Sequence, residues 1–175
     1  PHGIDDQKIY SFENVLYIET LLMLGKNDEA LNVYESMKNV DLLVREDMMV
    51  SNHIGPGPEE SDFDLDSATN SLWMKVLSLM GKRDEALMAY KSMAGCSNLV
   101  RGDALIATEI TEDKNKFDSD ISGRNNCLWI DALLSIGHEY DANAVYSSLA
   151  GLQGLVRSDG LLRSFVDEDY EPLDT

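Results

Sequence analysis

The sequence predicts an all-α fold of three tandem helical hairpins. One stretch occurs three times, as LGKNDEALNVYESM, MGKRDEALMAYKSM and IGHEYDANAVYSSL. Its glycines, Gly25, Gly81 and Gly137, lie 56 residues apart, twice, with no gap. Self-similarity at a fixed period is typical of repeat architectures. We therefore predict a single repeat domain over residues 1–175, with copies at about 6–61, 62–117 and 118–173.

Each copy is expected to contain two antiparallel helices. The first helix has apolar residues at helical spacing, such as Leu72, Val76 and Leu77 in the second copy. The repeated glycine should end this helix in a left-handed cap, and the acids that follow it should open the second helix. The residue expected to cap the start of the first helix is an asparagine, namely Asn14, Asn70 and Asn126.

An extended segment follows each hairpin, written LLVREDMMV, NLVRGDALI and GLVRSDGLL. Its Arg–x–Asp motif has two readings: a ring of charges lining a pocket, or an arginine paired locally at each junction between copies. Because the motif recurs in every copy, the local reading is favoured. The same recurrence argues against an adhesion role for the Arg-Gly-Asp triplet at Arg101–Asp103.

The hairpin sequences LGKNDEALNVY and MGKRDEALMAY resemble the core of tetratricopeptide repeats, although that family has a shorter period. Hairpins joined by long loops also resemble the (α/α) toroid class, which includes glycoside hydrolases, polysaccharide lyases and terpenoid cyclases. Such toroids commonly hold six hairpins in a ring. The resemblance implies an arc or a partial toroid: a fragment of a longer array, or a three-copy unit that closes by self-association.

The charge and the distribution of apolar residues argue against two classes of partner. The chain has 14 Lys and Arg residues against 32 Asp and Glu residues, a net charge of −18. Binding to nucleic-acid phosphates requires a basic surface, so no nucleic-acid partner is expected. The sequence also lacks a run of about 18 apolar residues, so no membrane insertion is expected.

Two acid-rich stretches are candidate calcium sites. DFDLDSATN and DSDISGRNN each place three oxygen-bearing side chains at alternate positions before a helix: Asp62, Asp64 and Asp66, then Asp118, Asp120 and Ser122. Ca²⁺ prefers six to eight oxygen ligands, which alternating side chains on a tight loop can supply in part. The alternative is that these residues cap the following helix and interact with its dipole.

Two cysteines, Cys96 and Cys127, come close to the same end of the predicted array. A disulfide between them is one reading, and two free thiols is the other. We expect an extracellular protein if both calcium and the disulfide are real, and a cytoplasmic protein otherwise.

Residues that break the repeat are the candidates for catalysis, since a single active site is asymmetric. They are His53, Glu59, Glu60, Glu109, Glu112, Asp113 and His138. A glycosidase needs two suitably spaced carboxyl groups, and the sequence fixes no such pair. Aromatic residues at one repeated position, Tyr17, Trp73 and Trp129, are read as core anchors, with sugar stacking as the alternative.

The leading interpretation is a non-enzymatic interaction or structural module, stabilised by Ca²⁺ if the acidic loops bind it, with a protein or carbohydrate partner. The alternative is part of a carbohydrate-active (α/α) toroid enzyme, either a glycoside hydrolase or a lyase.

Overall fold

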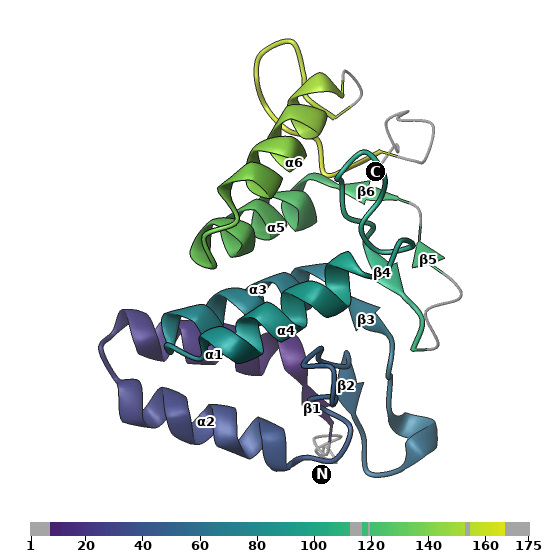
Figure 1. The fold of residues 1–175 in the computed structure, drawn as a ribbon. Helices are drawn as coiled ribbons and strands as arrows, with labels where there is room; N and C mark the ends of the chain where they lie inside the picture. Colours follow the sequence, from purple (N-terminus) through teal and green to yellow (C-terminus); the bar gives the residue numbers. More distant parts are fainter. Residues whose placement is uncertain (1–7, 113–116, 119, 153–154, 167–175) are drawn as a thin grey trace.

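A computed structural model describes residues 8–112, 117–118, 120–152 and 155–166 of the chain. Within them, six helices form three consecutive antiparallel pairs (Figure 1). The pairs are α1 (Ser11–Met23) with α2 (Asn27–Asn39), α3 (Ser67–Leu79) with α4 (Arg83–Ala94), and α5 (Gly123–Ser135) with α6 (Glu139–Gly151). The prediction of a mainly helical chain is confirmed. We call these pairs hairpins 1, 2 and 3.

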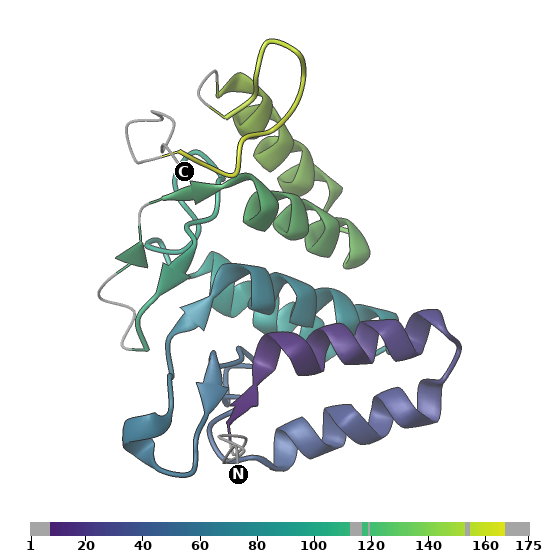
Figure 2. The same ribbon diagram turned by 180° about the vertical axis from the view of Figure 1, so that it is seen from behind.

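Short antiparallel strands fasten each loop to the start of its own hairpin. β1 (Ile9–Tyr10) pairs with β2 (His53–Ile54), and β6 (Ile121–Ser122) pairs with β7 (Phe165–Val166). Between them, β3 (Leu65–Asp66), β4 (Glu109–Ile110) and β5 (Phe117–Asp118) form one small sheet. The strands lie on one side of the molecule, at the starts of α1, α3 and α5, and the turns inside the hairpins lie on the other (Figures 1 and 2). We call the first side the strand side.

The turn inside each hairpin is the expected glycine cap. Gly25, Gly81 and Gly137 have φ values of 73°, 74° and 82°. In this left-handed region a residue without a Cβ avoids strain. At the first turn the amides of Gly25 and Lys26 bond back to the carbonyl oxygens of Leu22 and Leu21, which satisfies the end of α1.

The predicted asparagine caps are wrong, because the first helices begin three residues earlier. Asn70 lies inside α3 and holds the main chain of the preceding loop: its Oδ1 accepts from the Val50 amide at 2.8 Å, and its Nδ2 donates to the Val50 carbonyl at 3.0 Å. Asn126 makes the same pair of bonds to Ile106, at 2.9 and 3.2 Å. These asparagines therefore fix one copy to the next.

The first helices pack side by side, with α3 between α1 and α5 (Figure 2). Trp73 and Trp129 are 0% and 2% exposed, so their assignment to the core is confirmed. Tyr17, at the same repeat position in α1, is 51% exposed, so its assignment to the core is wrong. The difference arises because α1 has no hairpin on its outer side among the described residues.

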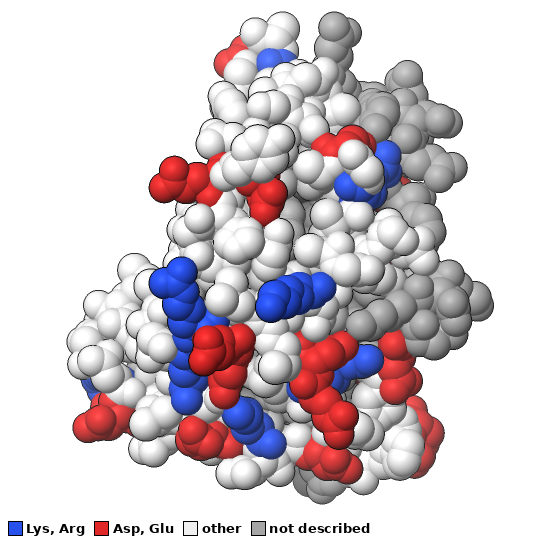
Figure 3. All heavy atoms as spheres, in the orientation of Figure 1, with Lys and Arg blue, Asp and Glu red and all other residues white. Residues whose placement is uncertain are grey.

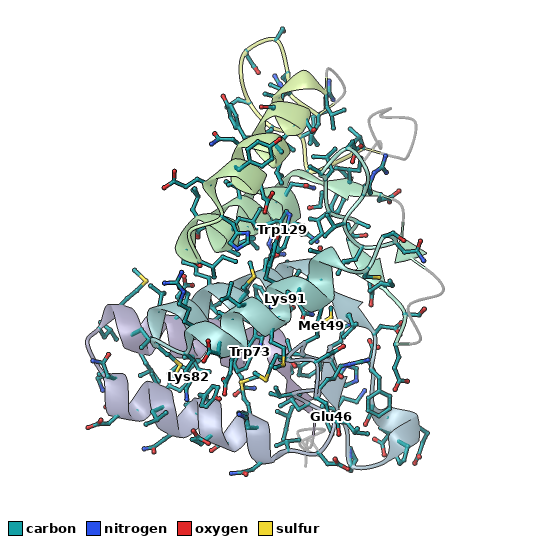
Figure 4. All side chains as sticks on the ribbon, viewed as in Figure 1. Glu46, Met49, Trp73, Lys82, Lys91 and Trp129 are labelled. Atoms are coloured by element: carbon teal, nitrogen blue, oxygen red, sulfur yellow. The ribbon has the colours of Figure 1, made fainter. Side chains whose placement is uncertain are left out.

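Contacts between hairpins 1 and 2 centre on Tyr34 of α2. Its ring stacks on Trp73 at a centroid distance of 5.7 Å, and Lys82 Nζ lies 4.0 Å from the ring centroid. Its hydroxyl donates to Glu85 at 2.6 Å. Figure 4 shows Trp73 and Lys82 between α2 and the second hairpin. Because the ring is buried and its hydroxyl meets a carboxylate, the pKa of Tyr34 rises to about 12. We call this contact the first joint.

Contacts between hairpins 2 and 3 repeat the arrangement, and we call them the second joint. Tyr90 stacks on Trp129 at 6.1 Å, and its ring lies 4.2 Å from that of His138. The Tyr90 hydroxyl donates to Asp141 at 2.8 Å. Lys82 and Glu85 of the first joint are thus replaced by His138 and Asp141, at positions 56 residues further on. The two joints therefore share one design.

The segments after the hairpins are turns rather than extended chain. Isolated bridges close them, Val44 with Val50, Val100 with Ile106 and Val156 with Leu162. Each arginine of the Arg–x–Asp motif forms an ion pair with the aspartate two residues on, at 3.5, 3.3 and 2.7 Å. The local reading of this motif is therefore confirmed.

No helix in the described ranges is long and apolar enough to cross a bilayer.

On the face in Figure 3, Lys and Arg side chains lie beside acidic ones in the lower half, where α2 and α4 lie. Lys38 with Glu85 and Lys82 with Glu35 are two such ion pairs.

Candidate functional site

A cluster of three carboxylates lies on the strand side. Asp62 and Asp64 precede β3, and Glu109 lies in β4, which pairs with β3. One oxygen from each residue lies within 4.8 Å of the others, and all three residues are partly buried. It is the one group with metal-binding spacing in the described part of the chain. We call it the carboxylate cluster.

Asn52 holds the cluster together. Its Nδ2 donates to Asp62 Oδ2 at 3.2 Å and to Glu109 Oε1 at 2.8 Å. Its Oδ1 accepts from the Asp66 amide at 3.2 Å, which orients the side chain. The Asp64 amide also donates to Asp62 Oδ1 at 3.0 Å. Main-chain and side-chain donors therefore fix two carboxylates that would otherwise repel each other.

Glu109 has the most perturbed environment in the cluster. Burial raises its pKa, and the negative charges of Asp62, Asp64 and Asp66 raise it further, while the Asn52 hydrogen bond opposes both effects. A carboxyl group whose pKa is raised by burial and by neighbouring acids is suited to proton transfer. A bound cation would reverse this preference by favouring the charged form.

The predicted calcium ligands separate into two roles. Asp62 and Asp64 join the cluster. Asp66 instead caps α3, where its Oδ1 accepts from the Thr69 amide at 2.7 Å, and Ser122 caps α5 by accepting from the Asn125 amide at 3.3 Å. The capping alternative is thus correct for these two residues.

The second predicted loop does not form a matching cluster in the described residues. Asp118 lies in β5 with its backbone opposite Glu109, and its side chain lies outside the described part of the structure. Asp120 precedes β6 and is partly buried.

The residues that break the repeat divide between the strand side and other regions. Glu112 reaches the cluster, because its amide donates to Asp64 Oδ1 at 3.0 Å. His53 lies in β2, with Nε2 3.1 Å from the Glu60 carbonyl and its ring 4.9 Å from that of Tyr10. Glu59 and Glu60 are exposed in the 3₁₀ helix Pro58–Glu60.

His138 belongs to the second joint rather than to the strand side. It lies at the start of α6 and meets Asp141 at 3.0 Å, which together with Tyr90 lowers the pKa of Asp141. Asp113 lies outside the described residues. His138 therefore does not join the carboxylate cluster.

Both cysteines are free, so the reading of two free thiols is confirmed and the disulfide reading is wrong. Cys96 is buried at the end of α4, whereas Cys127 is exposed in α5. Partial burial raises the pKa of the Cys127 thiol, which disfavours the reactive thiolate.

No protein-family model and no curated protein sequence matches this chain. Solved structures do match it. A D-mannose isomerase aligns with a TM-score of 0.79 at 10% identity, covering 98% of this chain and 48% of that one. A cellobiose 2-epimerase from Bacillus thermoamylovorans B4167 aligns with a TM-score of 0.73 at 9% identity, covering 98% and 52%.

A third match is described as a novel alpha-amylase from Clostridium perfringens. Its TM-score is 0.66 at 14% identity, covering 97% of this chain and 51% of that one. The chain therefore spans about half the length of the solved structures that it matches. These likenesses support the (α/α) toroid class for the fold, in partial form, and the tetratricopeptide-like hairpin core is not confirmed.

Proposed function

We propose that this chain is part of a carbohydrate-active (α/α) toroid and that its strand side binds a sugar. The observation that carries the proposal is the fold likeness over nearly the whole chain to proteins described as a mannose isomerase, a cellobiose epimerase and an amylase. This likeness favours the enzyme alternative over the non-enzymatic module. A fold alone does not determine function, so the proposal also needs a chemical site.

The carboxylate cluster supplies that chemistry. Sugar hydroxyls donate to carboxylates, and Asp62 and Asp64 present acceptors near a surface where His53 and Tyr10 add an imidazole and a phenol. Glu109, with its raised pKa, is the group suited to give or take a proton. In this proposal three 56-residue hairpin copies form half of a sugar-binding ring.

Binding can be tested by adding D-mannose, cellobiose and maltotriose separately to the ¹⁵N-labelled chain. We expect millimolar binding, with shifted amide signals at residues 52–54, 62–66 and 109–112. The double substitution Asp62→Asn with Glu109→Gln should weaken binding at least roughly tenfold, because each substitution replaces a carboxyl oxygen by an amide NH₂ group that cannot accept a hydrogen bond.

Glu59→Gln is the matched control, since Glu59 is an exposed acid on the same side of the molecule. It should leave binding unchanged. The proposal is wrong if none of the three sugars shifts these signals at about 50 mM, or if the double substitution binds as the parent chain does.

The cluster also fits a divalent cation, and Ca²⁺ is the ion we propose for it. Three carboxylates within 4.8 Å can supply part of the oxygen shell that Ca²⁺ requires, with main-chain carbonyls and water completing it. Binding to the folded state alone would stabilise the fold.

We expect about 5 mM CaCl₂ to raise the Tm by about 5–10 °C, since ligand at about 100 times Kd adds about 2.7 kcal/mol. Asp64→Asn with Glu109→Gln should abolish the rise. The control Glu59→Gln, which changes an exposed acid outside the cluster, should keep it, and the same concentration of MgCl₂ should have a smaller effect. A Tm that is insensitive to Ca²⁺ in the parent chain would exclude this site.

A further inference from the structure

Hairpin 1 has the residues that hairpins 2 and 3 use to contact the hairpin before them, but no described hairpin covers them. We call this uncovered side of hairpin 1 the receiving surface. In the two formed joints the later hairpin supplies an aromatic ring, a basic side chain and an acid: Trp73, Lys82 and Glu85, then Trp129, His138 and Asp141. The corresponding residues of hairpin 1 are Tyr17, Lys26 and Glu29. All three are exposed, and Lys26 already pairs with Glu29 at 2.8 Å.

Hairpin 3 carries the other half of a joint. Tyr146 occupies the position of Tyr34 and Tyr90, and it is 61% exposed, compared with 1% for Tyr34. In the loop after the hairpin, Leu161 is 61% exposed, whereas its counterparts Met49 and Leu105 are both 0% exposed. The side chains that other copies bury in a joint are therefore exposed at this end.

The receiving surface includes a groove between α1 and α2 with a volume of about 540 Å³. Tyr17, Asn14 and Ser36 line it. Asn14 Nδ2 donates to the Tyr10 carbonyl at 2.7 Å, just as Asn70 donates to the Asp66 carbonyl at 2.9 Å. The side-chain amide of Asn14 is therefore oriented like that of Asn70, which bonds the main chain of Val50. The residue that corresponds to Val50 and Ile106 after hairpin 3 is Leu162, so its main chain is the expected partner of Asn14.

Comparison of Ser36 with its counterparts predicts the same partner, the loop after hairpin 3. Its counterpart Ser92 donates to the carbonyl of Asp47 at 2.8 Å, and Ser148 donates to the carbonyl of Asp103. The third carbonyl in this series is that of Asp159, which is exposed in the loop after hairpin 3. Asn14 and Ser36 thus both match the 159–162 loop of this chain.

We propose that a second copy of this chain docks head to tail, with hairpin 3 of each copy on hairpin 1 of the other. Two such joints close a ring of six hairpins with twofold symmetry. A second copy is the favoured occupant because the two exposed ends complement each other by the pattern of the formed joints. The inference goes beyond sugar binding and does not depend on it.

Electrostatic repulsion opposes this association. Each copy has a net charge of −18, and the new joint would bring Asp131 of one copy near Glu19 of the other. Within one copy Lys75 lies between these two acids, at 2.8 Å from Glu19 and 2.6 Å from Asp131. The dimer should therefore form more tightly as the salt concentration rises, because salt screens like charges.

Sedimentation velocity on the 175-residue chain tests the proposal. We expect a particle of about 39 kDa, twice the chain mass of 19.5 kDa, with a Kd that falls between about 0.05 and 0.5 M NaCl. Tyr146→Glu and Tyr17→Glu should each raise that Kd at least roughly 30-fold, as expected for a central aromatic contact. Tyr140→Glu is the matched control, because Tyr140 is 87% exposed on the same helix as Tyr146 and has no role in the joint.

Mixing the two variants identifies the geometry. A ring of one Tyr17→Glu chain and one Tyr146→Glu chain keeps one intact joint, whereas either variant alone has none, so the mixture should dimerise more tightly than either. A monomer at all salt concentrations, a dimer that only one of the two substitutions weakens, or an open polymer would each overturn the proposal. Because Tyr17 and Tyr146 are exposed in the single chain, unchanged thermal unfolding of the variants would verify that folding is intact.

Discussion

At the scale of single residues, the asparagines in the first helices have the least expected role. Asn70 bonds both the amide and the carbonyl of Val50, and it lies 1% exposed between two hairpins. A buried peptide group that loses its partners keeps its desolvation cost. At each formed joint, one asparagine side chain therefore makes the two main-chain hydrogen bonds that a neighbouring β-strand would otherwise make.

Asn70→Ala should lower the free energy of unfolding by about 2–4 kcal/mol, because it leaves buried main-chain groups of Val50 without partners. Urea unfolding measures the change. Asn14→Ala is the control, with both substitutions made in the Tyr146→Glu chain so that no second copy covers α1: Asn14 holds the corresponding position on the open side of α1, and its loss should cost less than about 1 kcal/mol. Equal losses in the two variants would contradict the role assigned to Asn70.

Part of the carboxylate cluster can be predicted from the sequence. Alternation along one loop identifies Asp62 and Asp64, since both belong to one short acidic stretch. Glu109 lies in the same copy but on the far side of hairpin 2, and only the pairing of β3 with β4 brings it near. A strand of two residues leaves no periodic pattern, so the sequence could not connect Glu109 to the two aspartates.

At the scale of elements, the helices could be predicted and their starts could not. Apolar spacing and the repeated glycines locate all three hairpins. Each first helix starts directly after a short strand, β1, β3 or β6, and the capping residue therefore lies earlier than the asparagine. The segments after the hairpins contain β-branched residues, which favour extended chain. In the structure they form turns, in which the arginine and the aspartate of the Arg–x–Asp motif pair with each other.

Hydrogen exchange should differ between helices of equal length. α3 and α2 each have 13 residues, but α3 is packed on both sides and α2 exposes most of its residues. We expect α3 amides to exchange only with global unfolding and α2 and α6 amides to exchange at least roughly tenfold faster, through local opening. The Tyr146→Glu chain is the appropriate sample, since association would protect α6. Uniform exchange across the six helices would contradict this gradient.

At the scale of the whole molecule, fold class could be predicted better than function. The spacing of the hairpins indicated a partial toroid, and the matched structures support that class. The repeats dominate the sequence, and this favoured a structural module. The residues that we propose for sugar binding lie instead in the segments around the hairpins, and the sequence contains no second example of the whole cluster to compare.

The ion pairs of Lys75 have a consequence for how such an array can arise. One position of the first helices is occupied by Glu19 in α1, Lys75 in α3 and Asp131 in α5. The charges at this position therefore alternate: acid, base, acid. Three identical copies would place three like charges in a row at this position. A tandem duplication of this hairpin could therefore stack well only after the middle copy had reversed its charge there, and hairpins 1 and 2 are no longer interchangeable.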